Sequence, residues 1–250
     1  MAISTPALQE KHFSNTTGPW TTGSFTPPAN SLLVAFGFVM VDESVSSPGV
    51  DAQADMQITD SAGLTWTKVV GHTQPNSWAS GLVAWVAQVG GSPASMTVTM
   101  SENGSWTAYS GCLQVLAVTA HDTADSVGHS EGFHRSDTGD GAWNLTMASA
   151  PALASMVIAA LATDHDDAGG NDATPGAGWT EIHDESAPSG NCLQTQYRTG
   201  STSTGLAWAD TATASPNYTN GAVVVEILEA PAGGGLSIAV AMHYYKRKRS

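Results

Sequence analysis

The sequence predicts an all-β protein: two tandem, related antiparallel β-sandwich units of jelly-roll or immunoglobulin-like type, followed by an extended C-terminal arm. Three observations support this fold class. Only 12% of the 250 residues are charged, against about 25% in an average soluble domain, and 26 glycines and 12 prolines separate short apolar runs. No segment places apolar residues at helical spacing over three turns, so we expect almost no helix. Finally, a set of sequence landmarks occurs twice in the same order.

Each half opens with a tryptophan, a proline eight residues later and a serine that begins a continuous apolar run. These landmarks are Trp20, Pro28 and Ser31 in the first half, and Trp143, Pro151 and Ser155 in the second. In both halves an acidic loop follows the apolar run.

The remaining landmarks are aromatic residues and a closing strand. Trp66 and Trp179 each stand before a threonine, and an aromatic residue lies eighteen or nineteen positions later, at Trp85 and at Tyr197. Each half then closes on an apolar strand, GCLQVLAVTA or GAVVVEILEA. This shared order of landmarks indicates a duplication. We expect Trp66 and Trp179 to be core anchors that each bury roughly 150–250 Å².

The duplication defines the expected domains. The first sandwich is placed at residues 1–120, the second at 121–232, and a glycine-hinged arm at 233–250. The spacing of turn residues predicts seven or eight strands in each sandwich.

Apolar patterning predicts which strands are central. The runs at 32–41 and 156–163 are continuously apolar, which predicts strands that either are central in a sheet with both faces covered or are partly covered by the other half. The segments 81–89 and 96–100 alternate more clearly, which predicts half-exposed strands.

The formal charge of −14 is unevenly distributed. Four of the eight basic residues stand at 246–249, which leaves 22 acidic against 4 basic residues before them, a formal charge of −18. A body this acidic repels nucleic acid and anionic lipid, so we expect neither as its partner. The basic tip could bind nucleic acid, an anionic surface or an acidic patch on a neighbouring subunit, or could simply be a solvated tail.

The C-terminal arm is the predicted assembly device. The segment LSIAVAMHYY is about ten residues long, half of what a membrane-spanning helix needs, and is interpreted as a strand that pairs with another subunit. The predicted assembly residues are Leu236, Ile238, Val240, Tyr244, Tyr245, Lys246, Arg247, Lys248 and Arg249. The N-terminal sequence has no apolar core of a signal peptide, so no secretory signal is expected. Cys112 and Cys192 lie in apolar runs, which favours free core cysteines.

Two patterns resemble catalytic or metal sites. The segment GHSEG at 128–132 matches G-x-S-x-G, in which a nucleophilic serine lies on a turn between a strand and a helix. The sequence on either side of Ser130 predicts neither element, so we expect no catalytic residue. The spacing of His121, His129 and His134 matches no common metal-ligand pattern, and we expect exposed loop histidines.

One acidic loop in the second half offers a cation site as an alternative to a solvated loop. Asp164, Asp166 and Asp167 supply several carboxylates in one loop, as Ca²⁺ prefers, but without the order of an EF-hand loop. We expect a solvated loop and no cofactor, with Ca²⁺ as the alternative.

The segment ITDSAGLTWTKV, followed by LVAWVAQVGGSPASMTVTMS and GCLQVLAVTA, resembles a β-sandwich unit of bacteriophage structural proteins, particularly minor tail proteins of phages that infect actinobacteria. The resemblance covers most of residues 20–230, and GWTEI and TQYRTG fit the partner half. It implies a virion component without catalytic residues, located at the tail tip, along the tail or on the capsid surface. Its implied partners are other virion proteins and copies of itself. Residues 233–250 match no part of this family pattern.

These observations give a leading hypothesis and two alternatives. The leading hypothesis is a non-enzymatic minor tail or tail-tip protein, assembled through subunit contacts and the arm. The first alternative is a carbohydrate-binding or host-adsorption module that contacts host cell-wall glycan through Trp78, Trp106 and Tyr109, which lie in turn-rich segments. The second is a capsid decoration protein. A hydrolase would rest on GHSEG and the histidines alone.

Overall fold

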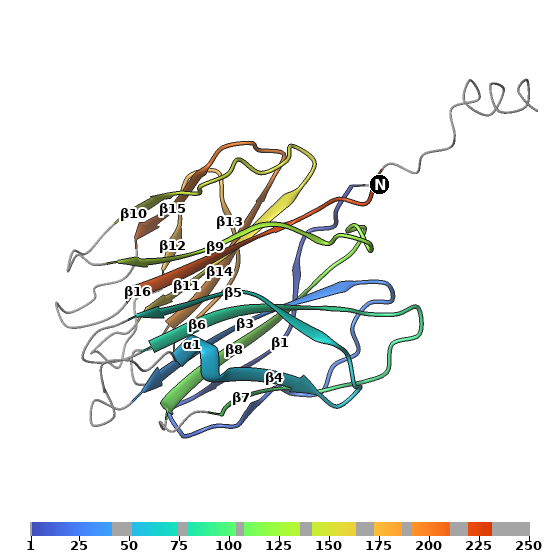
Figure 1. The fold of residues 1–250 in the computed structure, drawn as a ribbon, viewed down its shortest axis with the longest axis vertical. Helices are drawn as coiled ribbons and strands as arrows, with labels where there is room; N and C mark the ends of the chain where they lie inside the picture. Colours follow the sequence, from blue (N-terminus) through green and yellow to red (C-terminus); the bar gives the residue numbers. More distant parts are fainter. Residues whose placement is uncertain are drawn as a thin grey trace, which may run out of the picture.

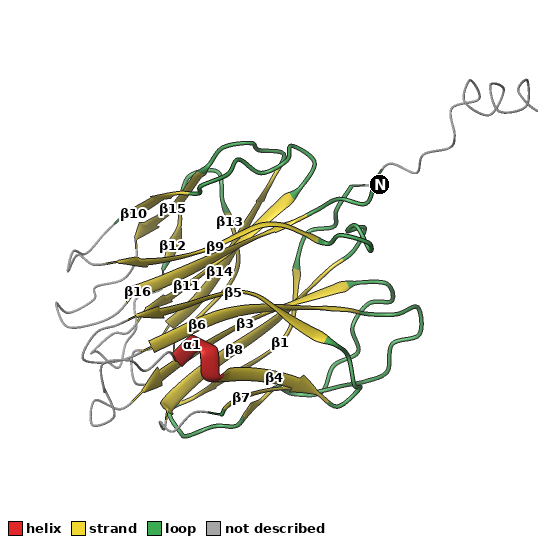
Figure 2. Cartoon of the chain, viewed as in Figure 1, coloured by secondary structure: helices red, strands yellow, loops and turns green. Residues whose placement is uncertain are grey.

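The computed structural model describes residues 2–41, 52–74, 80–103, 108–135, 142–163, 173–186, 192–210 and 220–231. Within these ranges the chain forms sixteen β-strands and a single four-residue helix (Figure 2). The predicted all-β sandwich class is confirmed.

The first half contains eight strands and the helix. Their bounds are β1 Ala7–Ser14, β2 Trp20–Thr21, β3 Leu32–Val41, α1 Ala52–Asp55, β4 Met56–Asp60, β5 Trp66–Gln74, β6 Ser80–Gln88, β7 Val98–Glu102 and β8 Ala108–Val118. The second half contains eight more. They are β9 Val127–Arg135, β10 Trp143–Thr146, β11 Met156–Thr163, β12 Thr174–Pro175, β13 Thr180–Ser186, β14 Cys192–Thr199, β15 Gly205–Asp210 and β16 Asn220–Ile227.

The two halves have the same sheet topology. The first half forms a five-stranded sheet of order β1-β8-β3-β6-β5 and a three-stranded sheet of order β2-β7-β4. The second forms β9-β16-β11-β14-β13 and β10-β15-β12, so adding eight to each strand number of the first half reproduces the second. All pairs within these sheets are antiparallel and join strands of one half.

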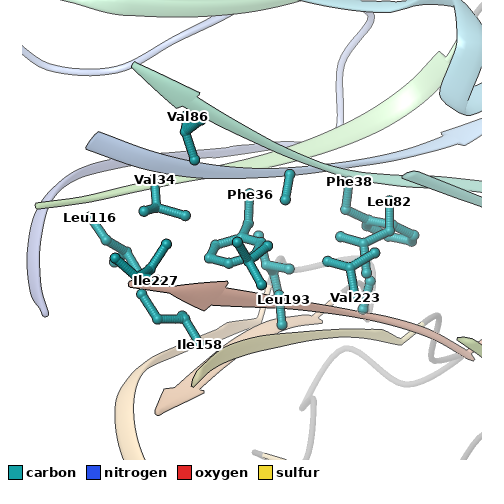
Figure 3. Close-up of a cluster of buried hydrophobic side chains, with 14 of the residues drawn as sticks. Val34, Phe36, Phe38, Leu82, Val86, Leu116, Ile158, Leu193, Val223 and Ile227 are labelled. Atoms are coloured by element: carbon teal, nitrogen blue, oxygen red, sulfur yellow. The ribbon is translucent and has the colours of Figure 1, made fainter. Parts of the chain in front are cut away.

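The four sheets are stacked in four layers (Figure 1). One apolar core lies between the five-stranded and three-stranded sheets of the first half, and another lies between those of the second half. A third core joins the two five-stranded sheets face to face, and we call this contact layer the seam. Figure 3 shows side chains from β3 directed toward side chains of β16, β11 and β14 across the seam.

The four-layer arrangement explains the fully apolar strands. β3 and β11 are each central in their sheet and buried at every position, because the outer sheet covers one face and the other half covers the second. This confirms the prediction for both runs. The expectation that 81–89 is half-exposed is wrong, since β6 is buried from Ser80 to Ala87 between the same two layers. β7 does alternate as predicted.

The landmarks fall on equivalent strands, with one correction. Ser31 and Ser155, which stand just before β3 and β11, each donate a hydrogen bond to the carbonyl three residues earlier, at 2.8 and 2.6 Å. With these serines aligned, the strand registers place Trp85 opposite Ala35 and Gln196 opposite the equivalent Ala159. Gln196, and not Tyr197, is therefore the structural equivalent of Trp85. Because neighbouring strand residues face opposite ways, Trp85 faces the outer sheet whereas Tyr197 faces the seam.

Candidate functional site: the seam between the two halves

The G-x-S-x-G segment lies on β9 at the edge of the seam, and packing accounts for both of its glycines. A Cβ atom at Gly128 would clash with the Glu226 carboxylate. A Cβ at Gly132 would lie 3.2 Å from the carbonyl oxygen of Gly71 on β5, in the other half. The side chain of Ser130 also crosses the seam, where its hydroxyl donates a 2.9 Å hydrogen bond to the carbonyl oxygen of Val69. The segment therefore joins the halves, and its hydroxyl proton is directed to a backbone carbonyl.

Glu226 on β16 is a buried acid that anchors two neighbouring segments. Its exposed fraction is 6%, and its two carboxylate oxygens accept hydrogen bonds from the backbone N–H of His129, at 2.9 Å, and of Ala152, at 2.6 Å. Burial alone would raise the pKa of Glu226, but the side chain of Ser155 and these two N–H groups outweigh burial and lower the pKa. The carboxylate is thus held charged as a structural acceptor.

Of the three histidines singled out from the sequence, the structure describes the side chains of His121 and His129, and each has a partner of its own. His121 is 3% exposed and its Nε2 lies 2.7 Å from Oε1 of Gln88, so the expectation of an exposed loop residue is wrong for it. The same expectation is wrong for His129, which is partly buried on strand β9 with Nε2 3.0 Å from the carboxylate of Glu131. His134 is also on β9, although its side chain lies outside the described part. Among the described residues no group of three His, Cys, Asp or Glu side chains could hold a metal ion.

One flank of the seam carries a charged contact between the edge strands β1 and β13. The Lys11 ammonium pairs with the Glu185 carboxylate and lies 3.1 Å from Nε2 of His183. The same His183 nitrogen is 2.9 Å from Glu185 Oε2. Burial lowers the pKa of His183, and the charge of Lys11 lowers that pKa further. His183 is therefore kept neutral between a cation and an anion.

The centre of the seam contains one polar connection that sequence reasoning missed. Gln114 on β8 is fully buried, and its Nε2 donates a 2.6 Å hydrogen bond to the carbonyl oxygen of Leu193 on β14. Its Oε1 accepts a 2.7 Å bond from the hydroxyl of Thr195. The only sequence signal was a glutamine inside the apolar run GCLQVLAV. This connection fixes how the two sheets are placed against each other, because buried amides need their partners.

Strand β14 also carries a polar row on its other face, inside the second sandwich. Gln194 accepts a 2.6 Å bond from the Trp208 indole N–H, and Gln196 donates to the carbonyl of Ala207 at 3.0 Å. Arg198 donates to the carbonyls of Ser203 and Gly205, and its guanidinium carbon lies 4.4 Å from the centroid of the Trp179 ring. Burial lowers the pKa of Arg198. The equivalent positions of β6 are Val83, Trp85 and Ala87, so only the second sandwich has this polar interior.

Most of the residues predicted as sites lie outside the described part of the chain. The assembly residues between Leu236 and Arg249 lie outside the described residues, as do Trp78 and Trp106 and the aspartates Asp164, Asp166 and Asp167. Tyr109 lies on β8, but its side chain is not described. Cys112 and Cys192 are both buried, and neither forms a disulfide bond. Burial raises the pKa of the Cys112 thiol, and the Cys192 thiol lies 2.9 Å from the Asp184 carboxylate.

Comparison with known proteins gives no relative: no family model, no curated protein and no solved structure matches the chain. In the described part of the chain, no helix has the length and apolar character to cross a membrane.

Proposed function

We propose that this protein is a non-enzymatic virion structural protein, a minor tail or tail-tip component that assembles through subunit contacts and its C-terminal arm. The resemblance of segments 58–69, 82–101 and 111–120 to phage tail proteins supports the class. The use of Ser130 and Glu226 as packing groups supports a structural over a hydrolytic role. A fold can serve many functions, so the proposal depends on surface features as well.

The observation that carries the proposal is an uncharged face on the outer sheet of the first half. Alternate residues of β2, β4, β7 and the adjoining turn point away from the core and form rows of hydroxyl and amide groups. We call this the hydroxyl face, and it consists of Thr21, Gln57, Thr59, Thr97, Thr99 and Ser101. The Thr21 and Thr99 hydroxyls are 2.9 Å apart. In a body with a formal charge of −18, an uncharged face is suited to protein contact, because interface cores are depleted of charge.

Removal of the arm tests this proposal. A chain without residues 233–250 should still fold, since the described strands end at β16, but should not be incorporated into virus particles. Incorporation is measured by mass spectrometry of purified particles from cells that supply either the full chain or the shortened chain. A second variant keeps the full chain length but changes residues 246–249 to glutamates. It should also fail to be incorporated, because the charge of the tip and not the length of the chain is required. Normal occupancy of the shortened chain would contradict the proposal.

A further inference from the structure

We infer that the cleft between β5, β6 and the linker joining the two halves binds a neutral polyhydroxylated molecule of monosaccharide size. The cleft has a volume of about 390 Å³, within the usual range for small-molecule sites of about 300–1,000 Å³. It is lined by Leu32, Thr65, Thr67, Val86, Ala87, Gln88 and Ser126. This site involves none of the aromatic residues suggested by the sequence, and it adds a ligand to a protein whose proposed role is structural.

The chemistry of the lining selects the class of ligand. Its polar groups are the hydroxyls of Thr65, Thr67 and Ser126 and the amide of Gln88, and no charged side chain lines it. Beneath them Leu32 and Val86 form an apolar floor that is almost completely buried, with 0% and 7% of these residues exposed. Hydroxyls and an amide both donate and accept hydrogen bonds, which matches the hydroxyl groups of a neutral sugar, while the apolar floor matches its C–H faces.

One polar group of the cleft is held in a fixed orientation by a buried residue. Nε2 of His121 lies 2.7 Å from Oε1 of Gln88, and this contact holds the Gln88 amide in one orientation. Gln88 also lines the cleft, so the part of its amide that His121 does not engage can meet a ligand. Burial lowers the pKa of His121, which keeps the imidazole neutral near neutral pH. A polar group that is oriented before binding loses less entropy when a ligand arrives.

Comparison of the two halves shows how the cleft is kept open. Val34 pairs with Val86, and the equivalent Ile158 pairs with Tyr197, so Tyr197 stands where the first half has Val86. Both side chains face the seam. The second half thus places a large aromatic side chain at the position that forms the floor of the cleft in the first half. The same substitution in the first half, Val86→Tyr, should fill the cleft within a backbone that already accepts tyrosine at the equivalent place.

Nuclear magnetic resonance of the full chain tests the inference. The probes are methyl α-D-glucopyranoside, methyl α-D-galactopyranoside and N-acetylglucosamine, with glucosamine and glucuronic acid as charged counterparts. At millimolar concentration at least one neutral probe should shift the Gln88 side-chain NH₂ signal in a saturable way. The Gln88 signal is assigned by its loss in Gln88→Ala.

Variants decide between a built site and unspecific contact. Val86→Tyr should abolish the saturable shift, whereas Asn144→Tyr, which adds the same side chain at an exposed position of β10, should retain it. Thr67→Val should weaken binding several-fold. Thr67 is exposed, so this substitution should not affect folding, and it keeps the test valid if Val86→Tyr does not fold. The inference is overturned if no neutral probe shifts Gln88, if Val86→Tyr binds as the native chain does, or if a charged counterpart binds more tightly than the neutral sugars.

Discussion

The hydroxyl of Thr195 donates a 2.7 Å hydrogen bond to Oε1 of Gln114, and both residues are fully buried between the two halves of the chain. At the equivalent positions on the other side of the seam stand Ala84 and Val223, which make an apolar contact layer. Two equivalent contacts across the seam therefore differ, because one is polar and the other is apolar. This difference allows the two five-stranded sheets to stack on each other in one orientation only.

A double-variant cycle tests that relationship. Gln114→Val should lower the free energy of unfolding by about 1–3 kcal/mol, because it removes the donor to the Leu193 carbonyl oxygen and leaves the Thr195 hydroxyl only a longer 3.3 Å contact with the His183 carbonyl oxygen. The pair Gln114→Val with Thr195→Ala copies the apolar side of the seam and should recover part of this loss. Urea unfolding of the native chain, the two single variants and the double variant gives the coupling free energy between the two side chains. Additive effects of the two substitutions would show that the hydrogen bond does not connect the halves.

The glycines of the G-x-S-x-G segment should matter more than its serine. Gly132→Ala brings a Cβ to 3.2 Å from the Gly71 carbonyl, which is backbone and cannot move aside cheaply, and should destabilise the fold by about 1–3 kcal/mol. Ser130→Ala removes one hydrogen bond and should cost about 1 kcal/mol. Gly90→Ala, where nothing lies within 4 Å of the added Cβ, is the matched control. Thermal unfolding ranks the variants, and a serine effect larger than the Gly132 effect would contradict the packing account.

Glu226 should make stability dependent on acid pH. Its pKa is lowered in the folded protein, so its contribution is present above the ordinary glutamate value of about 4.3 and is lost as the pH falls through the folded pKa. Glu226→Gln should lower stability by about 1–3 kcal/mol at neutral pH and flatten the acid limb of the curve. The melting temperature measured against pH for both proteins tests this. Parallel curves would mean that the carboxylate charge has no role in the fold.

His183 should produce a second pH dependence at higher pH. The pKa of His183 is lowered in the folded state, so protonation of His183 favours the unfolded chain. The free energy of unfolding is therefore highest above the ordinary histidine pKa of about 6.5 and declines as the pH falls below it. His183→Gln should reduce the loss of stability between neutral and mildly acidic pH, as measured by urea midpoints. Lys11→Met removes one cause of the lowered pKa, brings the folded pKa nearer to the ordinary histidine value and should therefore make this decline smaller. An unchanged pH profile in both variants would refute this assignment.

The sequence predicted the fold class and the order of the repeat because these depend on local patterns. The continuous apolar runs of β3 and β11 correctly indicated strands covered on both faces. The same reasoning failed for β6, since alternating small and large apolar residues resemble a half-exposed strand when the covering layer is not known. The alignment of Trp85 with Tyr197 failed by one residue, because spacing along the chain does not show which face a side chain occupies.

The candidate sites were less predictable, because the seam brings together residues far apart in the sequence. Gln114 and Thr195 are separated by 81 positions, and His121 meets Gln88 across 33 positions. Neither pair forms a spacing motif. The GHSEG segment was visible as a pattern, but its packing against Gly71 depends on how the halves are stacked. The predicted arm and aromatic contacts lie outside the described residues and stay predictions.

The most direct test of the proposed assembly role is the mass of the purified protein in solution. Light scattering is recorded for the full chain and for a chain that ends at Ala232. We expect a closed oligomer of the full chain and a folded monomer of the shortened chain, because the arm supplies the contact between subunits. The same oligomeric state for the two chains would contradict the role of the arm in self-assembly.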